Sequence, residues 1–324
     1  MKYATMVSAA ALALGLGAAA EAKEFRFGHV GAPGSLFEAT ANAFAECVEQ
    51  NSDGEHTVAV FGSSQLGGDR EMLQKLKLGQ MDFSLPSSVM SSVDPTFGVF
   101  EMPYIVRDRD HMRRVSEQMG DTFQTAANDN GFHIVGFVEN GFRHITNNVR
   151  PVNTPDDLQG VKLRTPNGEW RVKMFQLYGA NPTPMAFSDV FTALKTGVID
   201  GQENPYAQIA SAKFQEVQEY LSVTGHVYTP GYILTASRTF DGLSEDQQTL
   251  LTDCGREAQD FTYEKAAELE TELLQVIKDA GVEVNEADKQ AFVDASGPVY
   301  DELANSVEGG RELIDRVQGL AEGS

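Results

Sequence analysis

The chain has 324 residues and carries 47 acidic against 25 basic side chains, a formal net charge of −22 at pH 7. Such an acidic protein repels nucleic acid and anionic membrane surfaces, so we expect neither as a partner. An anionic small molecule is still permitted, because salt screens the overall charge over about 8–10 Å and a pocket can carry its own arginines.

Residues 1–22 have the pattern of a secretory signal peptide. Lys2 precedes an apolar run from about Met6 to Ala20, and Ala20-Glu21-Ala22 is a small-residue cleavage site. The run is too short for a spanning helix, which needs about 20 apolar residues. We therefore predict export to the periplasm, cleavage before Lys23 and a soluble mature protein with no stable membrane anchor. Its length of about 300 residues gives room for two domains.

Strands and helices alternate along the mature chain, which predicts an α/β fold with a mostly parallel sheet and ligands at the strand ends. Apolar patterns predict strands at 25–27, 57–61, 81–85, 132–138 and 161–164, and extended segments at 198–201 and at 223–237 with a break at Pro230-Gly231. Helical periodicity predicts helices over 37–48, 69–78, 108–119, 121–130, 168–179, 188–197, 206–214 and 245–279. The last helix is unusually long for a globular protein.

Cys47 and Cys254 are the two cysteines of the sequence. Each lies in an apolar helical pattern, which favours two buried free thiols, although an exported chain could pair them as a disulfide. The sequence contains no C-x-x-C and no Cys/His spacing typical of a metal site. We therefore predict neither a metal site nor a cofactor.

The most informative stretch runs from Gly160 to Pro205. A strand over 161–164 delivers Arg164 into a Thr-Pro-Asn-Gly turn, and turns after strands are where α/β folds bind ligands. The stretch ends in Gln202-Glu203-Asn204-Pro205, a second turn with two amides and a carboxylate. A guanidinium can donate to both oxygens of a carboxylate, which suits Arg164 to an anionic ligand. On spacing alone, a surface salt bridge explains the same arginine.

This stretch resembles the solute-binding proteins of tripartite ATP-independent periplasmic (TRAP) transporters. The family's spacing is kept by the pieces LRTPN, PMAFS, ALKTG and DGQENP, and the resemblance extends over nearly the whole mature chain through FRFGH, SSQLGGDREMLQKLKLGQMDF, MPY and NGFRHITN. It implies a two-lobed periplasmic-binding-protein fold with mixed sheets, crossing hinge strands and a long helix that spans both lobes. Lobe I would comprise residues 23–140 and 230–269, and lobe II residues 141–229 and 270–324.

The resemblance also implies roles for single residues. Arg164 would clamp the carboxylate of the ligand, and Asn204 would orient it. Arg143 faces the ligand in some family members, and its alternative role is a hinge salt bridge. Phe187 either lines the ligand or packs in the core, and Glu203 is expected to be the partner of an arginine. Further candidate ligand contacts are Gly31, Asp69, Ser87, Trp170 and Tyr228.

We therefore expect a binding protein, not an enzyme, which closes around a small organic acid and delivers it to the permease subunits in the membrane. One alternative is a secreted α/β enzyme acting on a small acid, although the mature chain has no G-x-S-x-G, H-E-x-x-H or P-loop. The other is a binder for an ATP-driven importer.

The rim residues narrow the expected ligand. Sialic-acid-binding relatives place a polar residue where this chain has Val30 and an acid where it has Ser87, which leaves fewer partners for a large polyhydroxylated sugar. We therefore expect a smaller acid. The options are a short sugar acid, a hydroxy or keto acid, or a four-carbon dicarboxylate whose second anionic end meets Arg143.

Overall fold

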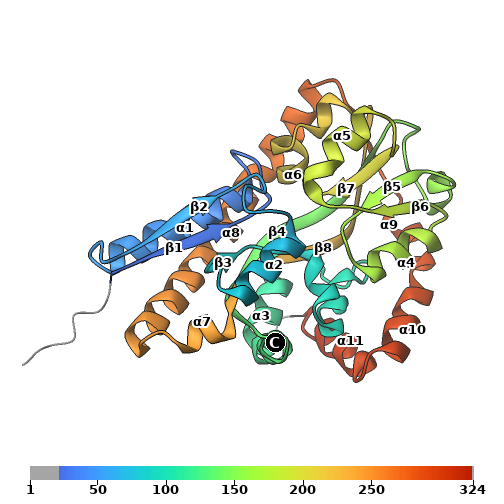
Figure 1. Ribbon diagram of the computed structural model, residues 1–324. Helices are drawn as coiled ribbons and strands as arrows, with labels where there is room; N and C mark the ends of the chain where they lie inside the picture. Colours follow the sequence, from blue (N-terminus) through green and yellow to red (C-terminus); the bar gives the residue numbers. More distant parts are fainter. Residues whose placement is uncertain (1–21, 323–324) are drawn as a thin grey trace, which may run out of the picture.

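One continuous sheet joins two lobes. The computed structural model describes residues 22–322, and within them the strands follow the order β2-β1-β3-β8-β4-β7-β5-β6, with β9 beside β8. Figure 1 shows β1, β2 and β3 at one side of the molecule, β5, β6 and β7 at the other, and β4 and β8 between them. The strands are β1 (Lys23–Gly28), β2 (His56–Phe61), β3 (Phe83–Ser84), β4 (Phe132–Asn147), β5 (Lys162–Thr165), β6 (Asn181–Pro184), β7 (Gly201–Asn204), β8 (Tyr220–Ala236) and β9 (Glu283–Glu286).

Helices alternate with these strands, as the α/β pattern predicted. The α-helices are α1 (Leu36–Asn51), α2 (Asp69–Leu78), α3 (Arg109–Asp129), α4 (Glu169–Leu177), α5 (Val190–Lys195), α6 (Tyr206–Ser211), α7 (Ser237–Asp241), α8 (Glu245–Asp279), α9 (Lys289–Ala295), α10 (Gly297–Ser306) and α11 (Gly310–Gly319). Short 3₁₀ helices are η1 (Ser88–Ser92), η2 (Pro95–Glu101), η3 (Pro155–Leu158), η4 (Phe187–Asp189) and η5 (Phe214–Glu216).

Separate groups of buried apolar side chains define the two lobes. The largest core joins β1, β3, α1, α2 and α3, and includes Phe44 and Phe83, whose ring centroids lie 5.1 Å apart. A second core surrounds Phe175, and a third surrounds Ile209. We call the elements packed on the first core the first lobe, and those packed on the other two cores the second lobe. The predicted two-lobed α/β fold is confirmed, whereas its residue boundaries stay a prediction.

β4 and β8 are the crossing strands. They pair antiparallel from Phe132 opposite Ala236 in the first lobe to Asn147 opposite Tyr220 in the second. The sequence predicted that the first strand ends at 138 and that the second breaks at Pro230, but both strands run on. Pro230 is tolerated because it lies at a register shift of the pairing, where the ladder does not need the N–H that proline lacks.

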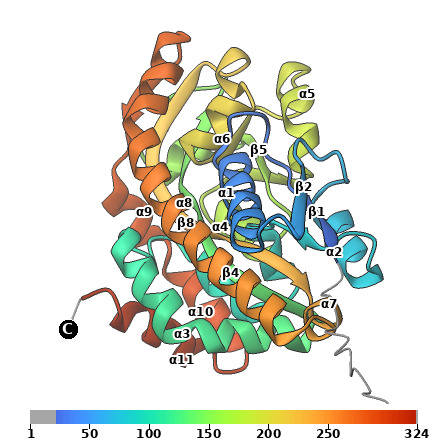
Figure 2. The ribbon, with the colours of Figure 1, turned by 90° about the vertical axis from the view of Figure 1, so that its left-hand side faces the viewer.

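The long helix α8 spans both lobes, as predicted, and Figure 2 shows it running along the length of the molecule. Ser244 caps it in a capping box with Gln247, and it packs against α1 and β4 in the first lobe and α6 in the second. Its backbone meets that of β4 directly, because a Cβ at Gly136 would lie 2.6 Å from the carbonyl oxygen of Gly255. Glycine at both positions therefore allows the backbone of α8 to pack directly against the backbone of the crossing strand β4.

Residues 108–119 and 121–130 form one helix, α3, and not two. Gly120 lies in its interior, where glycine costs roughly 1 kcal/mol relative to alanine. A buried row along the helix, with Met112, Val115, Met119 and Phe123, packs into the first core on both sides of this glycine. Tertiary packing thus outweighs the local signal for a helix end.

Cys47 and Cys254 form a disulfide, so the expectation of two free thiols was wrong. The bond joins α1 to α8, and the two Cα atoms lie 5.5 Å apart. Both residues are buried on apolar helix faces, as the sequence indicated. The local pattern could not show that these two helix faces, 207 residues apart in the sequence, pack against each other.

Removing the disulfide with Cys47→Ala and Cys254→Ala is expected to lower the free energy of unfolding by about 2–5 kcal/mol. The bond closes a loop of 207 residues, so its loss gives the unfolded chain much conformational freedom. Urea unfolding of the variant measures the effect, with reduced and oxidised wild-type protein as controls. Equal midpoints for the oxidised and reduced protein would contradict the prediction.

None of the helices between residues 22 and 322 is long and apolar enough to cross a membrane. In the same part of the chain, no group of three His, Cys, Asp or Glu side chains could hold a metal ion. The predicted signal peptide, apart from its last residue, lies outside the described residues.

Candidate functional site

A cavity of about 370 Å³ lies between the lobes, beside the crossing strands. Sites for small molecules typically enclose about 300–1,000 Å³. The walls come from the β1–α1 loop with Val30, the start of α1 with Phe37, the start of α2, the β3–η1 loop with the start of η1, β4, the turn after β5, the β6–η4 segment, and the β7–α6 segment. Polar side chains in the lining are Asp69, Arg70, Glu71, Ser87, Ser88, Asn140, Arg143, Arg164, Asn167, Ser188, Asp189, Asn204 and Gln208.

Arg164 extends from β5 into this cavity and is 3% exposed. Its Nε and Nη2 donate to the carbonyl oxygen of Met185, at 3.1 and 2.9 Å. Among the described residues, no carboxylate lies within ion-pair distance of this guanidinium and no acceptor meets its Nη1. Burial, with Arg143 nearby, lowers the pKa of Arg164 to about 10, so it stays protonated at neutral pH. The cavity therefore contains a buried cation without an anionic partner.

Arg143 enters from β4, and Glu203 of β7 holds it. The guanidinium donates from Nε to Glu203 Oε2 at 2.5 Å and from Nη2 to Glu203 Oε1 at 2.9 Å. Burial alone would raise the pKa of Glu203, but Arg143, Arg171 and a hydrogen bond from His226 hold it well below its ordinary value. Arg143 therefore lines the cavity and also forms the buried salt bridge, which combines both interpretations of the sequence.

Asn204 lies beside Arg143 in the cavity wall. Its Oδ1 accepts a hydrogen bond from Arg143 Nη2 at 3.0 Å, and its Nδ2 donates to Gln202 Oε1 at 2.6 Å. These contacts fix which end of the amide faces which neighbour, since oxygen must accept and nitrogen must donate. Asn204 is thus held in one orientation beside the cationic end of the cavity.

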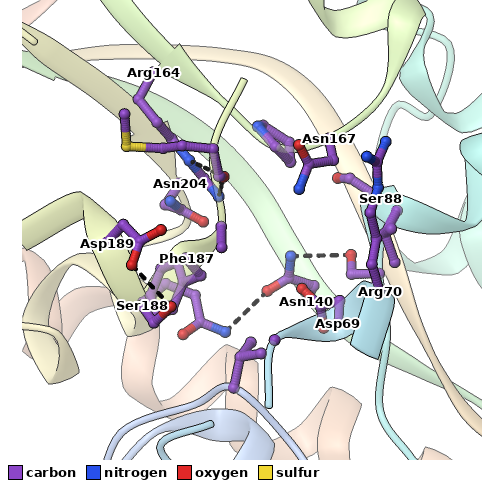
Figure 3. A pocket seen from close by; sticks show the side chains of 18 of the residues that line it. Asp69, Arg70, Ser88, Asn140, Arg164, Asn167, Phe187, Ser188, Asp189 and Asn204 are labelled. Carbon is purple, nitrogen blue, oxygen red and sulfur yellow. Dashed lines mark hydrogen bonds between the residues drawn. The ribbon is translucent and has the colours of Figure 1, made fainter. Parts of the chain in front are cut away.

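Three side-chain oxygens of the lining are buried and have no hydrogen-bond partner among the described residues: Asp69 Oδ1, Gln208 Oε1 and Ser88 Oγ. The Ser88 hydroxyl can donate as well as accept, whereas the other two oxygens are acceptors. The amide of Asn140 donates to Ser87 and Thr229, so its oxygen accepts from Gln208 Nε2 at 3.3 Å. Gln208 consequently keeps its oxygen free. Figure 3 shows Asp69, Arg70 and Ser88 on the opposite side of the view from Arg164 and Asn204. A ligand with donor groups near Asp69 and near Gln208 would satisfy both acceptors.

The structure brings most of the candidate residues together, but not all of them. Arg164, Asn204, Arg143, Phe187, Ser87 and Asp69 line the cavity. Phe187 lies under the Arg164 guanidinium, with its ring centroid 5.9 Å from Cζ.

Gly31, Trp170 and Tyr228 are not part of the cavity lining, contrary to the sequence-based expectation. Trp170 is 1% exposed, because the first turn of α4 directs it into the first core. Tyr228 is equally buried and packs edge to face with Phe142. Gly31 faces Ser35 and Phe37, and a Cβ there would meet the Ser35 hydroxyl.

Other lining residues were not identified from the sequence. Asn140 stands in the NGFRHITN piece, at the register shift between Glu139 and Gly141 of β4. Asn167 follows Arg164 in the same turn, and Gln208 lies one helical turn after Asn204. Their nearness to residues already singled out was the available signal. Arg70, next to Asp69 at the start of α2, carried no signal beyond its position.

Comparison with known proteins places this geometry in a family. The family model described as bacterial extracellular solute-binding protein, family 7, matches residues 27–306. The chain belongs to this family. Its similarity to TRAP solute-binding proteins is likewise confirmed, because a TRAP periplasmic solute-binding protein from Polaromonas sp. JS666, bound to D-erythronate, superimposes with a TM-score of 0.89 at 32% identity. That match covers 93% of this chain and 99% of the other.

Relatives within the family are named for different acids. The 2,3-diketo-L-gulonate-binding periplasmic protein of Escherichia coli K12 is 33% identical over 91% of this chain and 92% of its own length. The C4-dicarboxylate-binding periplasmic protein of Rhodobacter capsulatus is 34% identical over 96% and 95%. The family 7 chain is thus a solute-binding protein of the periplasmic TRAP type, and family membership alone does not choose its ligand.

The variant Asp69→Asn is expected to gain stability over the wild type as the pH rises from about 4 to about 6. Burial raises the pKa of Asp69 from its ordinary 3.8 to about 6, against the opposing effect of Arg164. In this window the folded wild type keeps a proton that the unfolded chain has lost, so its stability falls with rising pH. Urea unfolding of both proteins at several pH values measures the difference. A difference independent of pH would contradict the prediction.

Proposed function

We propose that the protein captures a hydroxylated monocarboxylate, of the sugar-acid class, in the interlobe cavity and delivers it to TRAP membrane subunits. The observation that carries the proposal is that one cavity contains both a buried Arg164 without an anionic partner and buried acceptors without a hydrogen-bond donor. The first calls for an anion, and the second calls for hydrogen-bond donors on the same molecule.

The carboxylate end of the ligand is assigned to Arg164. A guanidinium already fixed by two hydrogen bonds to Met185 needs little reordering to bind, which lowers the entropic cost of association. Closure of the lobes would remove water from the new ion pair and strengthen it. Arg143, held by Glu203, and Asn204, held by Arg143, would support the same carboxylate from the side.

The hydroxyl groups of the ligand are assigned to Asp69 and Gln208. A hydroxyl group donates its proton to either acceptor, whereas a second carboxylate has no proton to donate at neutral pH and would be repelled by Asp69. Arg143, the partner considered for a second carboxylate, has its charge balanced by Glu203 and lies near Arg164, so it serves the carboxylate bound there and not a second one. The acceptors therefore favour a sugar acid over a four-carbon dicarboxylate.

Export and delivery complete the proposal. The signal-peptide pattern of residues 1–22 supports cleavage before Lys23 and a mature protein in the periplasm. N-terminal sequencing of the protein purified from its native cells is expected to begin at Lys23. A sequence that begins at Met1 would contradict export by cleavage.

The direct test is to identify the molecule that copurifies with the protein. Freshly purified protein is denatured, and the released small molecules are analysed by mass spectrometry. A thermal-shift screen follows with D-galactonate, D-erythronate, succinate and sialic acid. We expect an intact sugar acid and the largest shift with a polyhydroxy monocarboxylate. A ligand without a carboxylate, a converted product, or a shift with succinate alone would contradict the proposal.

The variant Gln208→Leu sharpens this test. It removes one acceptor and leaves Arg164 untouched, so it should weaken binding of D-galactonate more than binding of succinate. The exposed Gln176→Leu on α4, outside this cavity lining, is the matched control. Equal effects of Gln208→Leu on both acids would argue against a hydroxyl contact.

A further inference from the structure

Arg171 lies where the two lobes meet, outside the cavity lining. It belongs to the first turn of α4 and is 0% exposed. Its Nη1 donates to Glu203 Oε2 at 2.6 Å, and its Nη2 lies 2.9 Å from Glu101 Oε2. Glu101 ends η2 in the first lobe, whereas Glu203 belongs to β7 in the second. One guanidinium therefore bridges carboxylates from both lobes.

The packing of α4 fixes this guanidinium from two sides. Trp170 is buried in the first core, where a Cβ on Gly98 would lie 2.5 Å from the indole Nε1. Met174 and Phe175, one turn further along, are buried in the second core. The helix is thus anchored in both lobes, with Arg171 at the boundary.

Glu203 connects Arg171 to the cavity. The carboxylate oxygen that accepts from Arg171 also accepts from Arg143 Nε, and the Glu203 backbone oxygen accepts from Arg143 Nη2 at 2.6 Å. Arg143 lines the cavity. The direction of its guanidinium depends on the Glu203 carboxylate, which Arg171 contacts from the side away from the cavity. We propose that Arg171 is a positioning residue, which aims Arg143 at the ligand through Glu203 and ties this arrangement to the first lobe through Glu101.

The role requires a guanidinium and not merely a positive charge. Two nitrogens of its planar fork meet two carboxylates at once, whereas a lysine ammonium is a single point charge on a flexible stem. Charge alone predicts that Arg171→Lys binds an anion unchanged. It also predicts that Glu101→Gln, which removes a carboxylate near an anion site, tightens binding or leaves it unchanged. Positioning predicts that both variants bind more weakly, so the two explanations predict different results for each variant.

This inference rests on the proposed function for its ligand, and D-galactonate is the probe. Calorimetry compares the wild type with Arg171→Lys and Glu101→Gln. Mutations along a coupling network typically change binding by roughly 2- to 30-fold, and we expect both variants to weaken it within that range. Glu270→Gln, which removes an acid of α8 but leaves the Arg109 contact with Glu139, is the matched control and should bind as the wild type does. Unchanged or tighter binding by both variants overturns the proposal.

A second measurement does not depend on the ligand. Leu78 and Val198 are 65% and 62% exposed, on the first and second lobe, and can carry spin labels as cysteines while Cys47 and Cys254 remain paired. Pulsed electron paramagnetic resonance then gives the distance distribution between the lobes. We expect a broader distribution for Arg171→Lys and Glu101→Gln than for the wild type and Glu270→Gln.

These two measurements separate the possible failures. If the wild type does not bind D-galactonate, the ligand class in the proposed function is wrong, and the distance distribution alone decides the role of Arg171. Distributions that match the wild type in both variants overturn the proposal. Thermal unfolding of each variant gives its melting temperature, and binding is compared well below that temperature, so that weaker binding reflects orientation and not loss of folding.

Discussion

Replacing Arg164 by alanine is expected to weaken binding of D-galactonate by at least about thirtyfold. Truncating one partner of a desolvated, hydrogen-bonded charge pair costs about 2–5 kcal/mol or more, and each 1.4 kcal/mol corresponds to a tenfold change in affinity. The loss should be large here because no other described cation of the cavity lining is both as buried as Arg164 and without an anionic partner. Arg143, which is equally buried, is paired with Glu203. Isothermal titration calorimetry of the wild type and the variant measures the effect.

Arg164→Lys should recover only part of this affinity. A lysine keeps the charge but loses the fork that donates to Met185 and to a carboxylate at the same time. Arg150→Ala is the matched control, because Arg150 is an exposed arginine of the second lobe outside the cavity lining. If Arg164→Ala bound the acid as tightly as Arg150→Ala, the assignment of Arg164 would be wrong.

The sequence predicted best those features that depend on neighbouring residues. The 69–78 helix and the long helix after Ser244 were found within a residue of their ends, because a glycine or a capping box marks each end. β6 was missed, since its two prolines do not suit a central strand. They are acceptable at the edge of the sheet, where β6 pairs with β5 alone among the described strands.

Features that depend on the meeting of distant segments were not predictable in this way. The Cys47–Cys254 bond requires α1 to lie on α8, and Trp170 lies in the first core because α4 crosses the boundary between the lobes. Tyr228 has the polar, aromatic character of a ligand contact, yet its side chain packs beside Phe142. Side-chain type suggested candidates, but the direction of each side chain is decided by the tertiary packing.

Arg164 illustrates how local and distant information combine at the site. Its position after a short strand was readable from the sequence, as was its suitability for a carboxylate. Only the structure shows that Arg164 has no carboxylate partner among the described residues. Glu203 forms its ion pairs with Arg143 and Arg171 instead. A surface salt bridge, the competing interpretation, is inconsistent with a side chain that is 3% exposed.

Glu203→Gln is expected to lower the free energy of unfolding by about 3–5 kcal/mol at pH 7, the usual cost of removing one partner from a buried ion pair. Glu203 is 0% exposed and accepts hydrogen bonds from Arg143 and Arg171 through its carboxylate. A neutral amide would leave two buried guanidinium groups with Glu101 as their nearest remaining carboxylate. The NH₂ group of the glutamine would also face the N–H donors of a guanidinium, so neither group would have an acceptor there.

The same variant carries a pH signature. Arg143 and Arg171 outweigh burial and hold the pKa of Glu203 well below its ordinary 4.5. A carboxylate with a depressed pKa stabilises the fold fully above its unfolded pKa, and this contribution is lost as the pH falls towards the folded value. The deficit of Glu203→Gln should therefore be constant at neutral pH and shrink below about pH 4.5.

Urea unfolding at pH 7 and at pH 4 measures this deficit. The exposed Glu283→Gln on β9 is the control and is expected to stay within about 0.5 kcal/mol of the wild type. A Glu203→Gln protein as stable as the Glu283→Gln control at pH 7 would mean that the buried ion pairs do not hold the cavity wall together.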